Sequence, residues 1–370
     1  MQADKSDIDE QYSMVYTGRF QLIPFLGDIL RQYFGPFRLL TSHLFLVIAG
    51  LYFAFTSVMF ILPKLFTRLP LDRGREFASQ AQLAKGKPTA SGIIFIPIFI
   101  IIALMVVPFN VEIYLILGIA LLTCISGYLD DSSKDAWGEY VKGFIDLILA
   151  LSASIVIAEM NGTTVWIPFS YKLFLLPLPA FIVLGTVIIW ISINCTNCSD
   201  GVDGLSSTLA IIGLVSLGLI LYLVLGNVKI SEYLLLPFIK NGAAWAIVAF
   251  SLAGAVLGYL WYNAFPSSVL MGDAGSRTIG FIIGILVLVT GNPFLLFVVS
   301  TILLVNGGTG LVKVALLRFF KIKIFHNIRF PLHDHVRETR NWSNPQVLVK
   351  FTIIQILLII SILGIFIKVR

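Results

Sequence analysis

Residues 243–277 read AAWAIVAFSLAGAVLGYLWYN followed by AFPSSVLMGDAGSR, and this stretch contains the pattern on which the fold depends. Its first 21 residues carry no charge. A helix of that length can cross the hydrocarbon core of a bilayer. The first charged residue after it is Asp273. We therefore expect a transmembrane helix over 243–263, followed by a loop that carries an acid at the membrane surface.

The same apolar pattern recurs along the chain. Of its 370 residues, 58% are hydrophobic and only 12% are charged, about half the charge of a soluble domain. Nine further runs of membrane-spanning length cover 39–63, 92–108, 111–129, 143–160, 173–193, 207–225, 278–291, 293–320 and 347–368. We predict an all-α polytopic integral membrane protein with about ten transmembrane helices.

Two details refine this organisation. The string Asn306-Gly-Gly-Thr-Gly310 lowers helix propensity inside the ninth run and predicts a bend there. Residues 1–38 carry several acids and are interpreted as an N-terminal tail or amphipathic segment. Residues 39–370 are interpreted as a single ten-helix membrane domain.

The orientation is predicted from the positive charges in the loops. The odd-numbered connections hold 15 Lys and Arg residues, and the opposite side, with both termini, holds nine. Cytoplasmic loops carry an excess of Lys and Arg. We therefore expect 64–91, 130–142, 194–206, 264–277 and 318–346 in the cytoplasm, and both termini outside.

Five aspartates fall on those odd-numbered connections, at the ends of apolar runs: Asp130, Asp131, Asp200, Asp203 and Asp273. Ionisable residues at membrane depth are costly and usually functional. Such a group of carboxylates would repel a phosphate unless a divalent cation lies between them and neutralises the negative charge. Mg²⁺ prefers oxygen ligands and often keeps one or two carboxylates plus substrate phosphates. Asp273 is the best candidate ligand, because flanking glycines permit close approach.

Several of these residues also have a purely structural interpretation. Adjacent residues on a helix point about 100° apart, so Asp130 and Asp131 cannot serve equally: one would bind metal while the other positions or deprotonates a nucleophile. Lys134 could hold a phosphate, or form a surface ion pair with Asp130. Asp203 could instead cap the helix that follows it.

A basic patch follows the ninth run. His333 and His335 lie near Arg329, Arg337 and Arg340, an arrangement suited to a diphosphate. The alternative is that these charges only reflect the positive-inside bias.

The motifs together carry a resemblance. They are Asp130-Asp131, Asn194-Cys-Thr-Asn-Cys-Ser-Asp-Gly-Val-Asp-Gly-Leu205, Trp261-Tyr-Asn263, Met271-Gly-Asp-Ala-Gly-Ser276 and His333-Asp-His335. In this order they resemble the polyprenyl-phosphate N-acetylhexosamine-1-phosphate transferases over residues 39–370. Within that family the chain is most similar to the branch that transfers phospho-N-acetylmuramoyl-pentapeptide.

The resemblance implies a Mg²⁺-dependent phosphoglycosyl transferase of peptidoglycan synthesis. Undecaprenyl phosphate would attack the β-phosphorus of UDP-N-acetylmuramoyl-pentapeptide, giving lipid I and UMP. The family also implies a homodimer in the bacterial inner (cytoplasmic) membrane, with its active site facing the cytoplasm and no nucleic-acid partner.

Carried over by position, the resemblance gives Asp130, Asp131, Asp273, His333 and His335 as catalytic, with Asp273 as the Mg²⁺ ligand. The substrate-binding residues would be Lys134, Lys142, Asn197, Asp200, Gly201, Val202, Asp203, Asn263, and Lys85 or Lys87. Asp334 stands where the family has a middle histidine, so Asp334→His is expected to keep activity.

Two other functions fit parts of the pattern. A sister enzyme that uses UDP-N-acetylglucosamine shares the acids, but such relatives tend to carry Arg-Lys-x-His before the second span, which 72–92 lacks. An ion-coupled transporter would place its acids at mid-membrane, whereas here they cluster at span ends.

Overall fold

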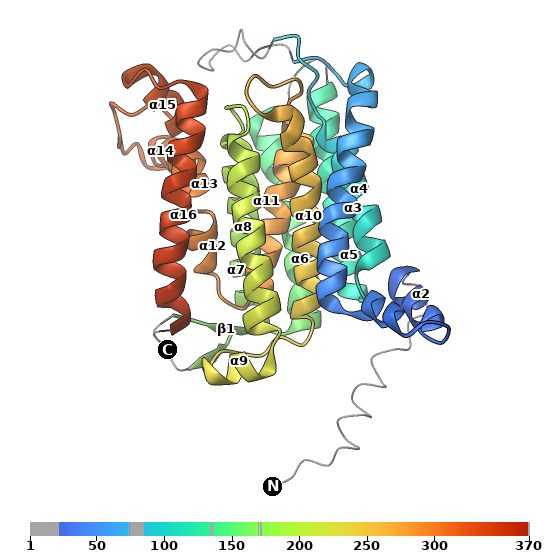
Figure 1. The fold of residues 1–370 in the computed structure, drawn as a ribbon. Helices are drawn as coiled ribbons and strands as arrows, with labels where there is room; N and C mark the ends of the chain where they lie inside the picture. The colour runs from blue at the N-terminus through green and yellow to red at the C-terminus, as the bar shows by residue number, and fades with distance from the viewer. Residues whose placement is uncertain are drawn as a thin grey trace.

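The computed structural model describes residues 22–72, 74, 85–133, 135, 137–168, 170 and 172–368. Within these residues, nine helices are long and apolar enough to cross a membrane, and one further apolar helix is shorter. Figure 1 shows them gathered into one bundle. The prediction of an all-α membrane protein with about ten spans is confirmed for this part of the chain.

The spans correspond one to one with the predicted runs. They are α3 (His43–Ile61) with its 3₁₀ extension η2 (Leu62–Arg68), α4 (Gly92–Val106), α5 (Val111–Ser132), α6 (Glu139–Asn161), α7 (Leu178–Cys198), α8 (Leu205–Leu219) with the π-helical η4 (Ile220–Leu225), α10 (Gly242–Asn263), α11 (Gly272–Val289), a broken ninth span and α16 (Asn344–Lys368).

Short elements occupy the two ends of the bundle (Figure 1). At one end lie α2 (Leu22–Leu30), η1 (Gly35–Thr41), α9 (Val228–Tyr233) and a hairpin of β1 (Thr164–Trp166) and β2 (Leu173–Leu175). At the other end lies α15 (Leu332–Thr339). The acidic motifs are at the α15 end.

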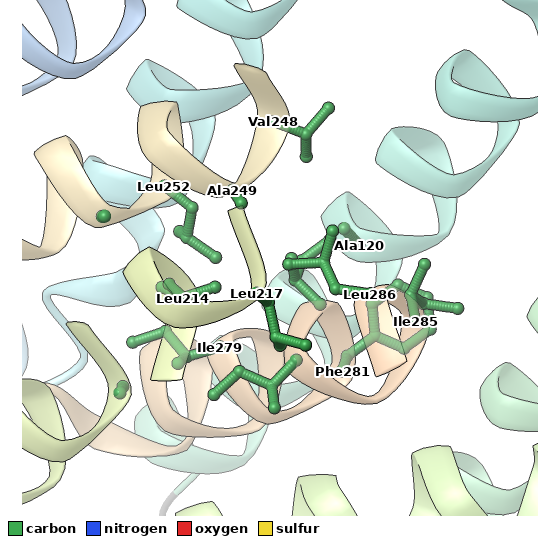
Figure 2. Close-up of a cluster of buried hydrophobic side chains, with 14 of the residues drawn as sticks. Ala120, Leu214, Leu217, Val248, Ala249, Leu252, Ile279, Phe281, Ile285 and Leu286 are labelled. Atoms are coloured by element: carbon green, nitrogen blue, oxygen red, sulfur yellow. The ribbon is translucent and has the colours of Figure 1, made fainter. Parts of the chain in front are cut away.

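Helix α11 forms the centre of the bundle, and all of its side chains are buried. Figure 2 shows the packing around it, in which each labelled residue is fully buried: Ile279, Phe281, Ile285 and Leu286 of α11, Leu214 and Leu217 of α8, Val248, Ala249 and Leu252 of α10, and Ala120 of α5. The first turn of α11, which contains Asp273, is therefore surrounded by the ends of other helices.

Glycines allow the helices to approach closely. A Cβ on Gly280 of α11 would lie 2.5 Å from the Ser192 carbonyl oxygen of α7. On Gly254 of α10 it would lie 2.1 Å from the Leu51 carbonyl oxygen of α3. Membrane helices associate largely through such close packing, because lipid tails are as apolar as the side chains. These contacts fix how the helices are rotated against one another.

The ninth span is broken where the sequence predicts a bend. It consists of α12 (Leu295–Val299), α13 (Thr301–Leu303), the π-helical η5 (Leu304–Gly308) and α14 (Thr309–Phe320). The π-helical segment coincides with the Asn-Gly-Gly string, as expected where helix propensity is low. None of the side chains of α14 is buried, so this helix leaves the packed interior.

The predicted boundaries of two spans are wrong. The eighth span was predicted to begin at 278 but begins at Gly272, because its polar first turn is buried in protein rather than exposed to lipid. Hydropathy cannot make that distinction. The fifth span was predicted to cover 173–193, but residues 173–175 form β2, and α7 begins after Pro177 and continues to Cys198. Within the predicted N-terminal segment, residues 1–21 lie outside the described residues.

Candidate active site

Three aspartates and one lysine meet at the α15 end of the bundle. Asp130 and Asp131 lie in the last turn of α5, and Asp273 lies in the first turn of α11. The Nζ of Lys142, in the first turn of α6, donates to Asp273 Oδ2 at 3.1 Å and forms an ion pair with Asp130. Asp130 and Asp273 are only 5% and 3% exposed. These four residues form the acid–lysine cluster.

The two adjacent acids are held differently. Asp130 Oδ1 accepts a hydrogen bond from the Trp137 backbone N–H at 2.8 Å, and its other oxygen meets Lys142. Asp131 Oδ2 accepts one from the Ala274 N–H at 3.2 Å. The first N–H groups of a helix have no intrahelical partner and favour negative charge. Asp131 therefore caps α11, while Asp130 faces the lysine.

Glycines bring α4 and α5 against the start of α11. A Cβ on Gly127, one turn before Asp130, would lie 2.5 Å from the Ala274 backbone nitrogen. On Gly92 of α4 it would lie 2.1 Å from the Gly275 nitrogen. The packing role of these two glycines was not predicted from the sequence. Their only signal was a glycine in or beside an apolar run, which is common in membrane helices.

A second group of polar residues, the loop cluster, joins three loops. Asp203 accepts hydrogen bonds from the Ser267 N–H at 3.0 Å and hydroxyl at 2.8 Å. The Nζ of Lys87 donates to the same hydroxyl at 2.9 Å and lies 3.9 Å from Asp203. Asn263 Oδ1 accepts from the Gly204 N–H at 2.8 Å. The helix-cap interpretation of Asp203 is wrong, because α8 has Gly204 at its N-cap and no side-chain cap.

The end of α7 and the loop that joins it to α8 are tied to neighbouring residues by hydrogen bonds. Asn197 Oδ1 accepts a hydrogen bond at 3.0 Å from Ser276, three residues after the aspartate of α11. Asp200 Oδ1 accepts one at 2.7 Å from Ser206. Val202 is buried. Asn197, in the last turn of α7, thus connects this region to the start of α11, whereas the bond between Asp200 and Ser206 is local.

The lysines proposed for substrate binding are not equivalent. Lys87 belongs to the loop cluster, and Lys142 to the acid–lysine cluster. Lys85 is exposed. Lys134 lies outside the described residues. The structure therefore favours Lys87 over Lys85 as the basic residue of that loop.

His333 lies between the broken ninth span and the loop that joins α7 to α8. Its backbone N–H donates to Asn306 Oδ1 at 2.8 Å, and its Nδ1 lies 3.0 Å from Asn306 Nδ2. A Cβ on Gly201 would lie 2.4 Å from its Nε2. His335 instead accepts a hydrogen bond at 3.4 Å from the Arg329 N–H. The sequence presented Asn306 only as a helix breaker, and its role in holding His333 was missed.

Asp334 is a centre of ion pairing. Arg337 Nη1 donates to it at 3.2 Å, and Arg329 Nε lies 4.0 Å from it. His333 Nε2 lies 3.6 Å from Asp334 Oδ1. Asp334 is 5% exposed and Arg337 is 7% exposed. The carboxylate therefore compensates buried positive charge, which the sequence interpretation did not anticipate.

This pairing changes the expected effect of Asp334→His. The buried Arg337 would lose its carboxylate and gain a second potential cation, and breaking a buried ion pair costs about 3–5 kcal/mol. We expect Asp334→His to lower the melting temperature in detergent and to lower turnover. Asp334→Glu keeps the carboxylate and should retain most of the wild-type stability and turnover. Thermal unfolding and an activity assay on the two variants test this. Wild-type stability and turnover in Asp334→His would contradict it.

Comparison with known proteins identifies relatives of this chain. Residues 113–291 match the family model described as Glycosyl transferase family 4. The phospho-N-acetylmuramoyl-pentapeptide-transferase of Treponema pallidum (strain Nichols) is 49% identical over 345 residues, covering 92% of this chain and 95% of the relative. A protein of the same name from Sulfurimonas denitrificans is 33% identical over 292 residues, covering 75% of this chain and 81% of the relative. Another, from Campylobacter curvus, is 30% identical over 349 residues, with coverages of 88% and 97%.

The similarity to the relative from Treponema pallidum extends over nearly the whole chain. The chain belongs to the phospho-N-acetylmuramoyl-pentapeptide-transferase family, within glycosyl transferase family 4.

Proposed function

We propose that this protein transfers phospho-N-acetylmuramoyl-pentapeptide from its UDP conjugate to undecaprenyl phosphate, forming lipid I and UMP. The observation that carries the proposal is the convergence of Asp130 and Asp273 on Lys142 at one end of a membrane bundle, with Asp131 bonded to the first turn of α11 beside them. The names of the relatives supply the substrate class. Buried carboxylates beside a lysine at a bundle end suit a reaction between a lipid-borne phosphate and a soluble diphosphate.

The proposed reaction forms one P–O bond and breaks another. An oxygen of the lipid phosphate attacks the β-phosphorus of the UDP-sugar, and the bond to the α-phosphate breaks, so that UMP leaves with the electron pair. A phosphate monoester is largely deprotonated near neutral pH, its second pKa being about 6. The attack therefore needs no strong base. Positioning and charge neutralisation are the main requirements of phosphoryl transfer.

The residues divide these tasks by position. Lys142 would offset charge on the reacting phosphates, with Asp130 orienting it. Lys87, held by Asp203 and Ser267, would face the nucleotide part of the substrate. His333, fixed by Asn306, would donate to a diphosphate oxygen.

Asp273 is our proposed Mg²⁺ ligand. It fits a cation, because Asp273 and Asp130 already direct carboxylate oxygens at one ammonium group. Among the described residues no group of three or more His, Cys, Asp or Glu side chains is arranged to hold a metal ion. Mg²⁺ does not require one, since it commonly takes one or two carboxylates and completes its shell with water and substrate phosphates. When bound, Mg²⁺ would neutralise the negative charge of the diphosphate.

The substrate assignment gives a direct test. With purified protein, undecaprenyl phosphate and Mg²⁺, we expect UDP-N-acetylmuramoyl-pentapeptide to be turned over far faster than UDP-N-acetylglucosamine. Radiolabelled sugar passing into the lipid phase, with UMP released in equal amount, would be the readout. Chelating the divalent cation should abolish turnover. Comparable kcat/KM values on the two nucleotide sugars would instead favour the sister enzyme.

We further propose a bacterial inner-membrane location, with the acid–lysine cluster facing the cytoplasm and both termini outside. In a variant lacking Cys124, Cys195 and Cys198, three exposed sites test the orientation: Asp135→Cys, Arg340→Cys and Glu232→Cys. An impermeant thiol reagent applied to intact cells should label only the cysteine at 232. Labelling at 135 and 340 but not at 232 would reverse the orientation.

We also propose, from the family resemblance, that the protein is a homodimer. Its mass in detergent, measured by light scattering, tests this. A monomeric mass for the active protein would refute it.

A further inference from the structure

A second charged pair lies one helical turn deeper than the acid–lysine cluster. Arg277 of α11 donates from Nε to Asp146 Oδ1 of α6 at 3.0 Å, and its Nη2 bonds to the same oxygen. The side chains are 0% and 2% exposed. Neither residue takes part in the reaction proposed above. An ionised pair inside an apolar bundle nevertheless calls for an explanation, because intramembrane charges are costly.

The pair repeats the geometry of the cluster with the charges reversed. Asp146 follows Lys142 by four residues on α6, and Arg277 follows Asp273 by four residues on α11. Residues four apart lie on the same face of a helix, one turn apart. In the first turn α6 supplies the cation and α11 the anion; in the second turn α6 supplies the anion and α11 the cation.

Each member of the deeper pair therefore has an alternative partner one turn away. The guanidinium of Arg277 follows the carboxylate of Asp273 on the same face of α11. The carboxylate of Asp146 follows the ammonium of Lys142 on the same face of α6. Opposite charges at this spacing attract each other. While Arg277 and Asp146 are paired, neither competes for the residues of the cluster.

The pair is not explained by stability alone. Replacing a buried ion pair by apolar residues is often neutral or stabilising. The packing suggests a different role. Helix α7 fits closely onto α11 at Gly280 and Gly284 and packs broadly against α6, whereas α6 meets α11 along a narrower contact. The two ion pairs lie in that contact, where they determine which groups of α6 and α11 face each other.

We propose that Asp146 and Arg277 are positioning residues whose pairing leaves Lys142 shared between Asp130 and Asp273. The inference rests on the proposed function, since it assigns Asp273 to cation binding. If Asp146 loses its charge, Arg277 turns to Asp273 and competes with the metal. If Arg277 loses its charge, Asp146 draws Lys142 away and leaves Asp273 more anionic. The two losses therefore act on Asp273 in opposite directions.

The test uses Mn²⁺ as a spectroscopic probe of that carboxylate. Free Mn²⁺ is measured by electron paramagnetic resonance on the purified full-length protein without substrates. We expect Asp146→Asn to weaken Mn²⁺ binding about tenfold, and Arg277→Met to strengthen it a few-fold, as expected for a unit charge added or removed nearby. In both variants kcat should fall at least tenfold, while KM for the nucleotide sugar changes little.

Three further variants complete the experiment. Glu112→Gln removes a buried carboxylate from the opposite end of α5 and should leave Mn²⁺ affinity and kcat unchanged. Arg277→Lys keeps the ion pair and should retain most of the wild-type Mn²⁺ affinity and kcat. The exchange Asp146→Arg with Arg277→Asp restores a pair and should recover the melting temperature. It should not recover kcat, because two cations then lie one turn apart on α6 and two acids on α11.

Shifts of Mn²⁺ affinity in the same direction in Asp146→Asn and Arg277→Met would overturn the inference. So would recovery of kcat together with melting temperature in the exchanged variant, because the pair would then be a structural link alone. Wild-type protein that fails to bind Mn²⁺ would refute the metal assignment of the proposed function instead. The exchanged variant would still test whether Asp146 and Arg277 are positioning residues, since its kcat and melting temperature are measured without Mn²⁺ as a probe.

Discussion

Asp273→Asn is expected to lower turnover by about a thousandfold or more, with the protein still inserting and purifying normally. Asparagine has nearly the same shape as aspartate, so the buried first turn of α11 can keep its packing. The charge is lost at the point where Lys142 Nζ lies 3.1 Å away and where we propose that Mg²⁺ binds. UMP release at saturating substrates, measured over a Mg²⁺ titration, gives the size of the effect.

Asp135→Asn is the matched control for this variant. Asp135 belongs to the loop between α5 and α6 at the same end of the bundle, but it is exposed. Removing its charge should change turnover little, because exposed charges are screened by water and salt. Asp130→Asn and Asp131→Asn should each lose most activity, the second also by weakening the start of α11. Near-normal turnover of Asp273→Asn at limiting Mg²⁺ would overturn the metal assignment.

Gly127→Ala should be nearly as damaging, although it changes no charge and adds a single methyl group. The new Cβ would lie 2.5 Å from the Ala274 backbone nitrogen, so α5 and α11 must separate. Overpacking of this kind costs about 1–3 kcal/mol. Displacing catalytic groups by about 1 Å can cost a hundredfold in rate. We therefore expect a loss of about a hundredfold in kcat with a smaller loss of thermal stability.

Gly118→Ala on the same helix is its control. A Cβ at Gly118 meets nothing within 4 Å, and alanine favours a helix over glycine by about 1 kcal/mol. This variant should keep wild-type turnover and be as stable as the wild type or slightly more so. Equal turnover in the two alanine variants would show that the Gly127 contact does not set the position of Asp130 and Asp131.

The transmembrane architecture could be predicted because its signals are local. Each span is a predominantly apolar run of about membrane length, and the bend in the ninth span follows from the Asn306–Gly310 string itself. The boundaries that failed are at α7 and α11. The start of α11 was missed because its polar residues are buried by other helices, and hydropathy assigns such residues to a loop.

The residues of the candidate site were predicted better than their partners. The order of the motifs indicated Asp130, Asp131, Lys142 and Asp273 as site residues. Because successive spans cross the membrane in opposite directions, the loops that carry these residues were expected at one end of the bundle. Asp146 was passed over, although an acid inside an apolar run carries the signal that intramembrane charge is usually functional. Arg277 was counted only as a loop charge, because the eighth span was predicted to begin at 278. Asp334 was interpreted from the sequence as replaceable by histidine. Its ion pairs with Arg337 and Arg329 form only when the segment around α15 is folded, so they could not be predicted.

The sequence alone determined that this protein is a ten-span membrane protein of the phosphoglycosyl transferase type, because apolar length and motif order can be read along one dimension. The tertiary structure alone decided that Asp131 caps α11 while Asp130 meets Lys142, that Lys87 rather than Lys85 joins Asp203, and that a second ion pair lies one turn deeper. Such pairings depend on how each helix is rotated and shifted against its neighbours. Contacts between residues far apart in the chain set that rotation and shift, with glycines allowing the close approach, and no local pattern records them.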